Sequence, residues 1–82
     1  MTELEILCDY IRTEIGYNGQ LDLDVDLLES KILDSFSIVQ LAVFIQYRFG
    51  IELEPEDLVR ANLAKLSSMI ALIGKRRTAI ER

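Results

Sequence analysis

The sequence predicts an all-α fold, a four-helix bundle with three main helices, one short helix and a long loop between the first two. Apolar residues recur three and four positions apart in three separate segments, which is the spacing of a helix with one buried face. Half of the 82 residues are hydrophobic, and one proline and four glycines leave little sequence for linkers. These features predict a single domain over residues 1–82, in which residues 75–82 form a basic tail.

Residues 3–15 are expected to form the first helix. Thr2 and Glu5 have the spacing of a capping box at its start, and Gly16 is suited to its end. Cys8 is the single cysteine of the chain, so no intrachain disulfide can form. We expect it to be a small core residue rather than a reactive thiol, because free cysteines are among the most buried residues. The apolar stripe of this helix consists of Leu4, Leu7, Cys8, Ile11 and Ile15.

Residues 17–33 show no helical period and are interpreted as an extended loop laid over a helical core. A loop of this length allows the first two helices to run in similar directions. Three alternating aspartates resemble the start of a calcium-binding loop, but Leu27 and Leu33 occupy the positions where such a loop needs Gly and Glu. The loop is therefore expected to be acidic and solvated. Its aspartates are Asp22, Asp24 and Asp26, and the residues expected to reach the core are Leu27, Leu28, Ile32 and Leu33.

The second helix is predicted to follow Asp34, a good N-cap, and to end at Gly50. It carries two apolar stripes, whereas a surface helix needs only one. The first stripe, Ile38, Leu41, Ala42, Ile45 and Phe49, is expected to pack against Leu7, Ile11, Met69, Ile70 and Ile73. The second consists of Phe36, Val39, Val43 and Tyr47.

The second stripe must meet another part of this chain or another molecule. We expect Phe36, Val43 and Tyr47, with neighbouring Gln40, to form a docking surface for partner proteins. The alternative is that the 17–33 loop folds over the stripe, in which case Val39 is the residue most expected to be buried. Because the helix lacks acidic side chains, docking is predicted to be mainly hydrophobic and only weakly dependent on salt. Should that fail, the three loop aspartates become the better candidates.

The C-terminal third predicts one short and one longer helix. Pro55 is suited to the first turn of a helix over residues 55–61, with Leu58 and Ala61 as its apolar face. A last helix is expected over residues 65–73, where Gly74 ends or weakens it. The following Lys75-Arg76-Arg77 cluster is interpreted as a solvated end that complements the helix dipole, with a partner-binding patch as the alternative.

The composition argues against most catalytic and nucleic-acid-binding functions. The net charge is −5, there is no histidine, and no metal-ligand set, catalytic triad or glycine-rich phosphate loop is visible. No basic leader or membrane-length apolar segment is present, so we expect a cytoplasmic protein that is not an enzyme and is a monomer on its own. One chemical feature remains, a serine in the first turn of a helix directly after an acidic N-cap. Such a position can stabilise a phosphate ester.

The wider pattern contains the motifs Leu33-Asp34-Ser35-Phe36, Phe49-Gly50-Ile51, Glu56-Asp57 and Asn62-Leu63. This pattern resembles the acyl carrier and peptidyl carrier protein family over nearly the whole chain. The resemblance implies that Ser35 carries a 4′-phosphopantetheine arm whose thiol holds acyl cargo as a thioester. It also implies that Asp34 assists the transferase that installs the arm, near its Mg²⁺. Phe36 replaces the commoner Leu or Met, and Lys31 stands where many relatives have Gly.

The second helix also bears on which carrier this is. Fatty-acid carriers have a strongly acidic second helix, whereas here the corresponding positions hold Ser37, Gln40, Gln46, Tyr47 and Arg48. The resemblance therefore favours a free-standing carrier of polyketide or mixed polyketide–nonribosomal biosynthesis. A D-alanyl carrier or a fatty-acid carrier is the alternative, and a helical interaction domain without a prosthetic group is the alternative of another class. The implied partners are a phosphopantetheinyl transferase, an acyltransferase or adenylating loading enzyme, and synthase modules.

Overall fold

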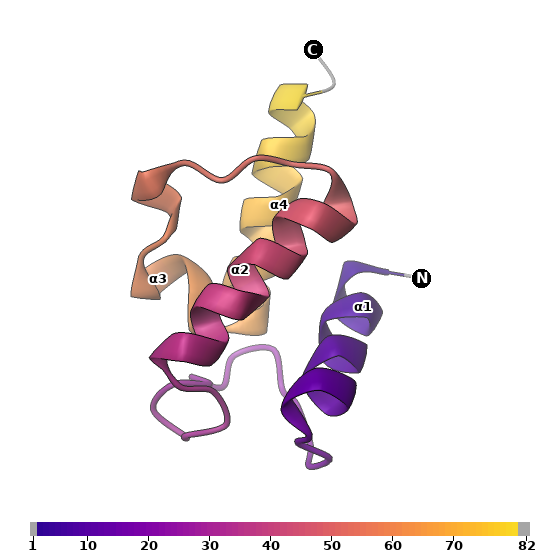
Figure 1. Cartoon of the computed structure of the whole chain (residues 1–82), viewed down its shortest axis with the longest axis vertical. Helices are drawn as coiled ribbons and strands as arrows, with labels where there is room; N and C mark the ends of the chain where they lie inside the picture. The colour runs from indigo at the N-terminus through magenta and orange to yellow at the C-terminus, as the bar shows by residue number, and fades with distance from the viewer. Residues whose placement is uncertain (1, 81–82) are drawn as a thin grey trace.

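The computed structural model describes residues 2–80, and within them it has helices and connecting loops but no strands (Figure 1). This confirms the predicted all-α bundle of three main helices and one short one. The α-helices are α1 (Glu3–Tyr10), α2 (Ser35–Phe49), α3 (Arg60–Leu63) and α4 (Leu66–Ile80), with a π-helical turn η1 (Ile11–Ile15) and a 3-10 turn η2 (Pro55–Asp57). None of the described helices is long and apolar enough to cross a membrane.

The start of α1 is fixed by the predicted capping box. The Glu5 amide donates to the Thr2 hydroxyl at 3.2 Å, and the Thr2 amide donates to the Glu5 carboxylate at 3.0 Å. The expected helix over residues 3–15 divides into α1 and the wider η1 turn. Gly16 then ends it in a left-handed conformation with φ 88°, which glycine adopts without a steric penalty.

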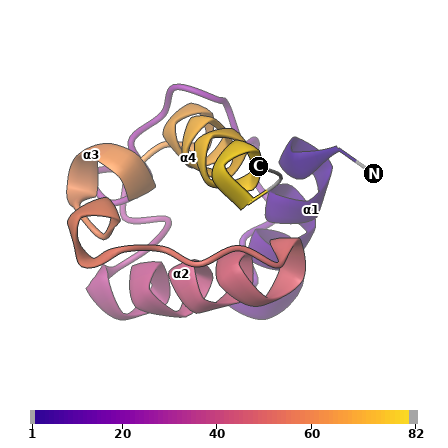
Figure 2. The ribbon, with the colours of Figure 1, turned by 90° about the horizontal axis from the view of Figure 1, so that it is seen from above.

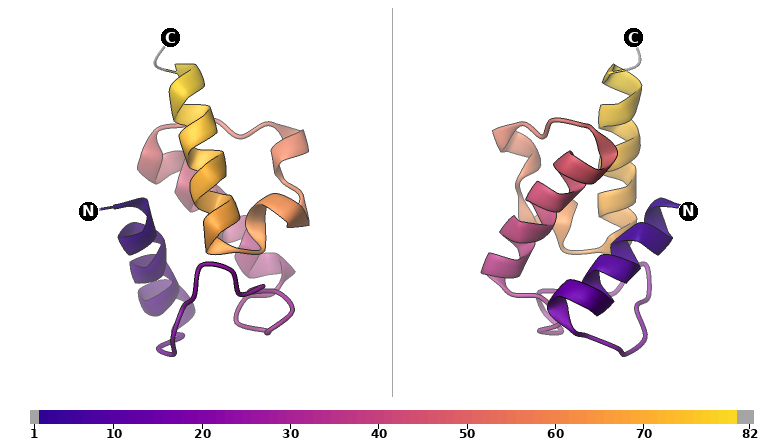
Figure 3. Two further views of the ribbon diagram at one scale, coloured as in Figure 1. Left: turned by 180° about the vertical axis from the view of Figure 1, so that it is seen from behind. Right: turned by 45° about the vertical axis from the view of Figure 1, so that its right-hand side comes forward.

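The first two helices do not run in similar directions, although the length of the loop between them would allow it. α1 runs antiparallel to α2 and to α4, because the 17–33 loop stays at one end of the bundle (Figures 1 and 3). The loop is held there by backbone hydrogen bonds from Leu27 to Ala64 at 2.7 Å and from Ser67 to Leu23 at 3.0 Å. Figure 2 shows α4 facing α2 across the core, with α1 and α3 on opposite sides.

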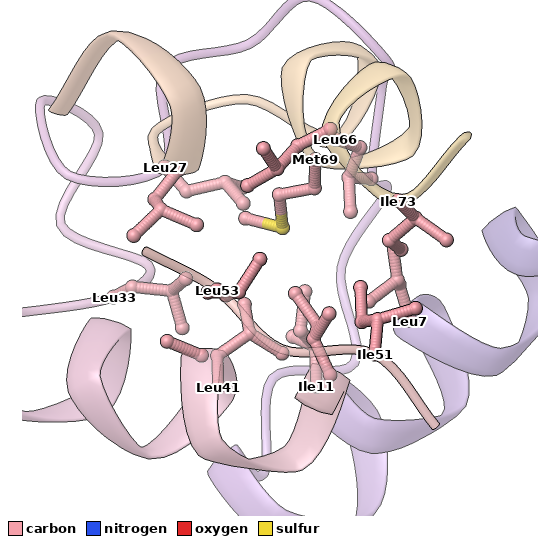
Figure 4. Close-up of a cluster of buried hydrophobic side chains, with 14 residues drawn as sticks. Leu7, Ile11, Leu27, Leu33, Leu41, Ile51, Leu53, Leu66, Met69 and Ile73 are labelled. Atoms are coloured by element: carbon pink, nitrogen blue, oxygen red, sulfur yellow. The ribbon is translucent and has the colours of Figure 1, made fainter. Parts of the chain in front are cut away.

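The hydrophobic core forms where α1, α2 and α4 meet (Figure 4). Most of the predicted contacts are confirmed, although Ile38, Phe49 and Ile70 are only partly buried. The loops add more than expected, because Ile51 and Leu53 enter the core from the connection after α2. Gln46 supports that connection by accepting from the Leu53 amide at 2.9 Å. The fully buried side chains are Leu7, Ile11, Leu27, Leu41, Ile45, Leu66, Met69 and Ile73.

The expected single helix over residues 55–61 is wrong. Pro55–Asp57 forms the η2 turn, and Leu58 and Val59 leave helical geometry before α3 begins at Arg60. The turn closes because the Glu54 amide donates to the Asp57 carboxylate at 2.8 Å, while Asp57 itself is drawn inside the protein. As a result, Leu58 and Val59 are exposed, as is Ala61, and the expected apolar face does not form.

The predicted end of the last helix at residue 73 is also wrong. α4 continues through Gly74 to Ile80, since a glycine in a helix interior costs only about 1 kcal/mol relative to alanine. Two residues of the expected basic tail instead form ion pairs with other elements, because Arg76 pairs with Asp57 and Arg77 pairs with Glu3. Residues 81 and 82 of that tail lie outside the described residues.

Candidate functional site

Ser35 is the first residue of α2 and is exposed at the end of the bundle that carries the 17–33 loop. Asp34 precedes it as N-cap in an extended conformation, and its carboxylate accepts from the Ser37 amide at 2.8 Å. The Ser35 hydroxyl makes no hydrogen bond to any of the described residues. An exposed hydroxyl without a hydrogen-bond partner can accept a phosphoryl group, and the positive end of the helix stabilises the resulting anion.

Asp34 supplies a negative charge directly beside this hydroxyl. The amide of Ser37 lowers the pKa of the Asp34 carboxyl, with smaller contributions from the Ser37 hydroxyl and nearby amides. The carboxyl is therefore ionised at neutral pH and held in place by the cap. A fixed carboxylate next to a nucleophilic oxygen can hold a divalent metal ion or orient a proton, which is compatible with the assistance expected from Asp34 in the transferase reaction. That assistance stays a prediction.

The loop that leads to Ser35 is shaped by Asp26. The Asp26 carboxylate accepts from the Leu28 amide at 3.0 Å and from the Glu29 amide at 2.8 Å, and Arg60 of α3 lies 3.2 Å away. The Glu29 amide is the main cause that lowers the pKa of Asp26, and Arg60 adds to it. Asp26 is half-buried, so the expectation of a fully solvated acidic loop is wrong at this position.

The other two loop aspartates are exposed, as expected. Asp24 accepts from the Ser67 hydroxyl at 3.0 Å, and Asp22 accepts from the Gln20 amide group at 2.8 Å. Within residues 2–80, no group of acidic, histidine or cysteine side chains is arranged to hold a metal ion.

The last part of the loop contains an unusual backbone position. The Leu33 amide donates to the Leu27 carbonyl at 2.9 Å and the Lys31 amide to the Leu28 carbonyl at 3.1 Å, which closes a compact turn before Asp34. Lys31 lies in this turn with φ 65°, in the left-handed region that favours glycine. A non-glycine residue can therefore occupy this position, although at the cost of an unfavourable backbone conformation.

The second apolar stripe of α2 is open to solvent. Phe36 is 70% exposed, Val43 58% and Tyr47 91%, and Gln40 beside them is exposed as well. The alternative that the 17–33 loop covers this stripe is wrong, and so is the expectation that Val39 is buried, since its exposure is 59%. α1 and α4 pack on the opposite side of α2 and the loop lies at its end, so nothing in the described chain covers this face (Figure 2).

Two features of the structure were not predicted from the sequence. Phe44, which the helical spacing placed among polar residues, stacks on Tyr10 with ring centroids 4.3 Å apart. This pair lines an open groove of about 460 Å³ between α1 and α2, and burial, together with Glu14, raises the pKa of Tyr10. The sequence pattern gives no signal for this stacking, because Tyr10 lies off the apolar stripe of α1. The groove is lined by Ile6, Asp9, Tyr10, Thr13, Glu14, Phe44 and Arg48.

The second unpredicted feature is a buried ion pair between η2 and α4. The Arg76 guanidinium donates to both carboxylate oxygens of Asp57, at 2.8 and 2.9 Å, and Asp57 is only 3% exposed. These contacts are the main cause that lowers the pKa of the Asp57 carboxyl. The pair attaches the segment after α2 to α4. Nothing in the sequence separates Asp57 from the exposed acidic residues around it.

Comparison with known proteins places the chain in a family. One similar chain belongs to a solved structure described as "Crystal structure of FAD-dependent dehydrogenase"; the two chains are 28% identical with a TM-score of 0.69, covering 82% of this chain and 97% of that one. The comparison with curated proteins gives no match. Residues 5–73 match the family described as the phosphopantetheine attachment site. Because this match spans most of the sequence, the chain belongs to the phosphopantetheine-attachment family, whose members are non-catalytic carriers with a covalent 4′-phosphopantetheine arm.

Proposed function

We propose that Ser35 is the attachment residue and that the chain is a free-standing acyl carrier of polyketide or mixed polyketide–nonribosomal biosynthesis. The observation that carries the assignment of Ser35 is its exposed, unbonded hydroxyl at the start of a 15-residue helix, directly after the ionised cap Asp34. The other serines fit less well. The Ser67 hydroxyl already donates to Asp24. The side chains of Ser37 and Ser68 are half-buried, and Ser30 lies within the loop rather than at a helix start.

Attachment at Ser35 can be tested by mass spectrometry of the intact protein. Incubated with coenzyme A, Mg²⁺ and a broad-specificity phosphopantetheinyl transferase, the wild-type chain should gain one phosphopantetheine and Ser35→Ala should gain none. Ser37→Ala, two residues further along the same helix turn, is the matched control and should be modified as the wild type is. Modification of a folded Ser35→Ala variant, or no modification of the folded wild type, would refute the assignment.

The exposed stripe Phe36, Val39, Val43 and Tyr47 supports a mainly hydrophobic docking surface for the enzymes that load and use the arm. These enzymes must approach Ser35, and the stripe begins one residue beyond it. α2 carries no acidic residue, and its one formal charge is Arg48. At 0.1 M, salt screens exposed charges that are more than about 10 Å apart. Because α2 offers so few charges to screen, we expect loading by the transferase to depend weakly on salt.

This docking surface can be tested with Val43→Asp, using Ala71→Asp on the exposed side of α4 as the control for an added charge. Val43→Asp should slow loading by about tenfold or more, since burying an unpaired carboxylate in an apolar interface costs more than about 1.4 kcal/mol. Ala71→Asp should load at the wild-type rate. Equal loading of the two folded variants, or a collapse of wild-type loading in modest salt, would refute hydrophobic docking.

The absence of acidic side chains along α2 also supports the biosynthetic context over a fatty-acid carrier. A direct test supplies the modified chain with three kinds of loading enzyme: a polyketide acyltransferase with an acyl-coenzyme A donor, a D-alanine-activating enzyme, and a fatty-acid malonyl transferase. We expect efficient loading by the first. Preferential loading by either of the others would replace this context with the D-alanyl or fatty-acid alternative.

A flavin-dependent dehydrogenase is a further candidate partner, because the similar solved chain comes from a crystal structure named for such an enzyme. That chain is shorter than this one, since 82% of this chain covers 97% of it, so it has the size of a carrier. We propose that an acyl group on the arm is oxidised by an enzyme of this class. The dehydrogenase of that structure, mixed with the acyl-loaded chain, should lose its oxidised-flavin absorbance. If it responds no faster than to the same acyl group on free pantetheine, this partner is refuted.

A further inference from the structure

Lys31 is the single non-glycine residue with positive φ among the described residues. It lies in the turn closed by the Leu33–Leu27 and Lys31–Leu28 backbone hydrogen bonds, just before the cap of α2. Glycine would adopt this conformation without strain, so the lysine side chain is kept here against the preference of the backbone. Strain at an exposed position four residues before the proposed attachment residue points to a role for the side chain itself.

The charges around Lys31 indicate what that role is. Between Arg12 and Arg48 the chain contains six acidic residues and one basic residue, Lys31. The described residues form three ion pairs, Arg60–Asp26, Arg76–Asp57 and Arg77–Glu3, and none of them includes Lys31. Its ammonium group is therefore a cation uncommitted to any ion pair within the described fold, and it lies four residues before Ser35.

Attachment of the arm adds a phosphodiester anion at Ser35, directly beside the ionised carboxylate of Asp34. The positive end of α2 offsets part of this repulsion, but the cap already uses the Ser37 amide. A long, flexible lysine side chain on the preceding turn can supply the missing positive charge. We propose that Lys31 is a positioning residue for the arm, whose ammonium neutralises the phosphodiester on Ser35. This inference rests on the attachment proposed above.

The test compares the thermal midpoint of the chain before and after attachment of the arm, at low ionic strength and at about 1 M salt, where the screening length is about 3 Å. The variants are Lys31→Asn, which tolerates the left-handed backbone but lacks the charge, and Lys31→Arg, which keeps the charge. Lys75→Gln, at an exposed position of α4, controls for the loss of a distant positive charge. Lys31→Gly lacks both the charge and the strained backbone, so its difference from Lys31→Asn measures the strain, and it should raise the midpoint of the unmodified chain by about 2–6 °C relative to Lys31→Asn.

At low ionic strength the arm should lower the midpoint of Lys31→Asn by about 1–4 °C more than that of the wild type. Lys31→Arg and Lys75→Gln should behave as the wild type, and the difference should vanish in 1 M salt. A merely structural lysine would change the midpoint before attachment but not the effect of attachment. An equal effect of the arm in all four proteins would overturn this inference and leave Ser35 as the attachment residue. Failure to attach any arm would instead refute the attachment proposal itself.

Discussion

Replacing Arg76 with glutamine should destabilise the domain, because it leaves the buried carboxylate of Asp57 without its ion-pair partner. The substitution removes both hydrogen bonds from Arg76 to Asp57, a residue that is 3% exposed, and among the described residues it leaves the Asp57 carboxylate with just the Glu54 amide as a donor. Breaking one side of a buried ion pair typically costs about 3–5 kcal/mol. Because the Arg76 side chain is 20% exposed and water can partly replace it, we expect about 2–3 kcal/mol. This is a large share of the roughly 4–12 kcal/mol available to a domain of this length.

The neighbouring residue provides a matched control for this prediction. Arg77 also pairs with a carboxylate, that of Glu3 at 2.8 Å, but both side chains are well exposed. Arg77→Gln removes the same charge one position further along α4, and its effect should stay below about 1 kcal/mol. Urea denaturation followed by circular dichroism measures both variants. Equal losses for the two substitutions would refute the reasoning, because the predicted difference depends on the burial of Asp57.

The dependence on pH provides a second check on the same ion pair. Folding lowers the pKa of Asp57, so the pair contributes its full stability above the unfolded-state pKa of about 3.9. That contribution is lost as the pH falls through the lower folded-state pKa. The difference in stability between wild type and Arg76→Gln should therefore be constant from about pH 5 to 8 and should shrink in more acidic solution. A difference that grows in acid would contradict this assignment of charge.

Three further predictions concern the site and the core. Ser35→Ala should change the free energy of unfolding by less than about 1 kcal/mol, because the hydroxyl is exposed and unbonded; a larger loss in urea denaturation would give Ser35 a structural role. Phe49→Ala should cost about 1–3 kcal/mol, less than the roughly 3–5 kcal/mol of a fully buried phenylalanine, and an unchanged midpoint would exclude its packing on the core. Asp26→Ala should speed hydrogen exchange at the Leu28 and Glu29 amides, whereas Asp22→Ala should not; equal exchange would show that Asp26 does not hold the turn.

The main helices could be predicted because each carries its own signals. The capping box at Thr2, the cap at Asp34 and the left-handed Gly50 are local chemistry, and the structure shows each of them where the sequence places it. The short elements could not be predicted in the same way. η2 and α3 separate because Asp57 turns inward to Arg76, 19 residues further along the chain. A contact of that kind has no periodicity, so the pattern after Pro55 predicts one helix.

The candidate site was predictable for a different reason. A serine after an acidic cap is a local pattern, and the exposure of Phe36, Val43 and Tyr47 follows from a helix with more apolar surface than so few neighbours can cover. Burial of Val39 was a wrong expectation because it assumed that the 17–33 loop reaches the stripe. The loop is held at the end of the bundle by Leu27 and Ala64, and neither residue signals that contact in the sequence.

An exposed apolar face on α2 restricts how so small a domain can be stabilised. A fourth long helix packed over the stripe would add burial but would block the approach to Ser35. The chain instead draws core residues from its connections, with Leu27 and Leu33 from the loop before α2 and Ile51 and Leu53 from the segment after it. The Asp57–Arg76 pair then holds that second segment on α4. Stability is therefore supplied from the far side of α2 and from its two ends, which leaves its outer face open, as the docking proposed above requires.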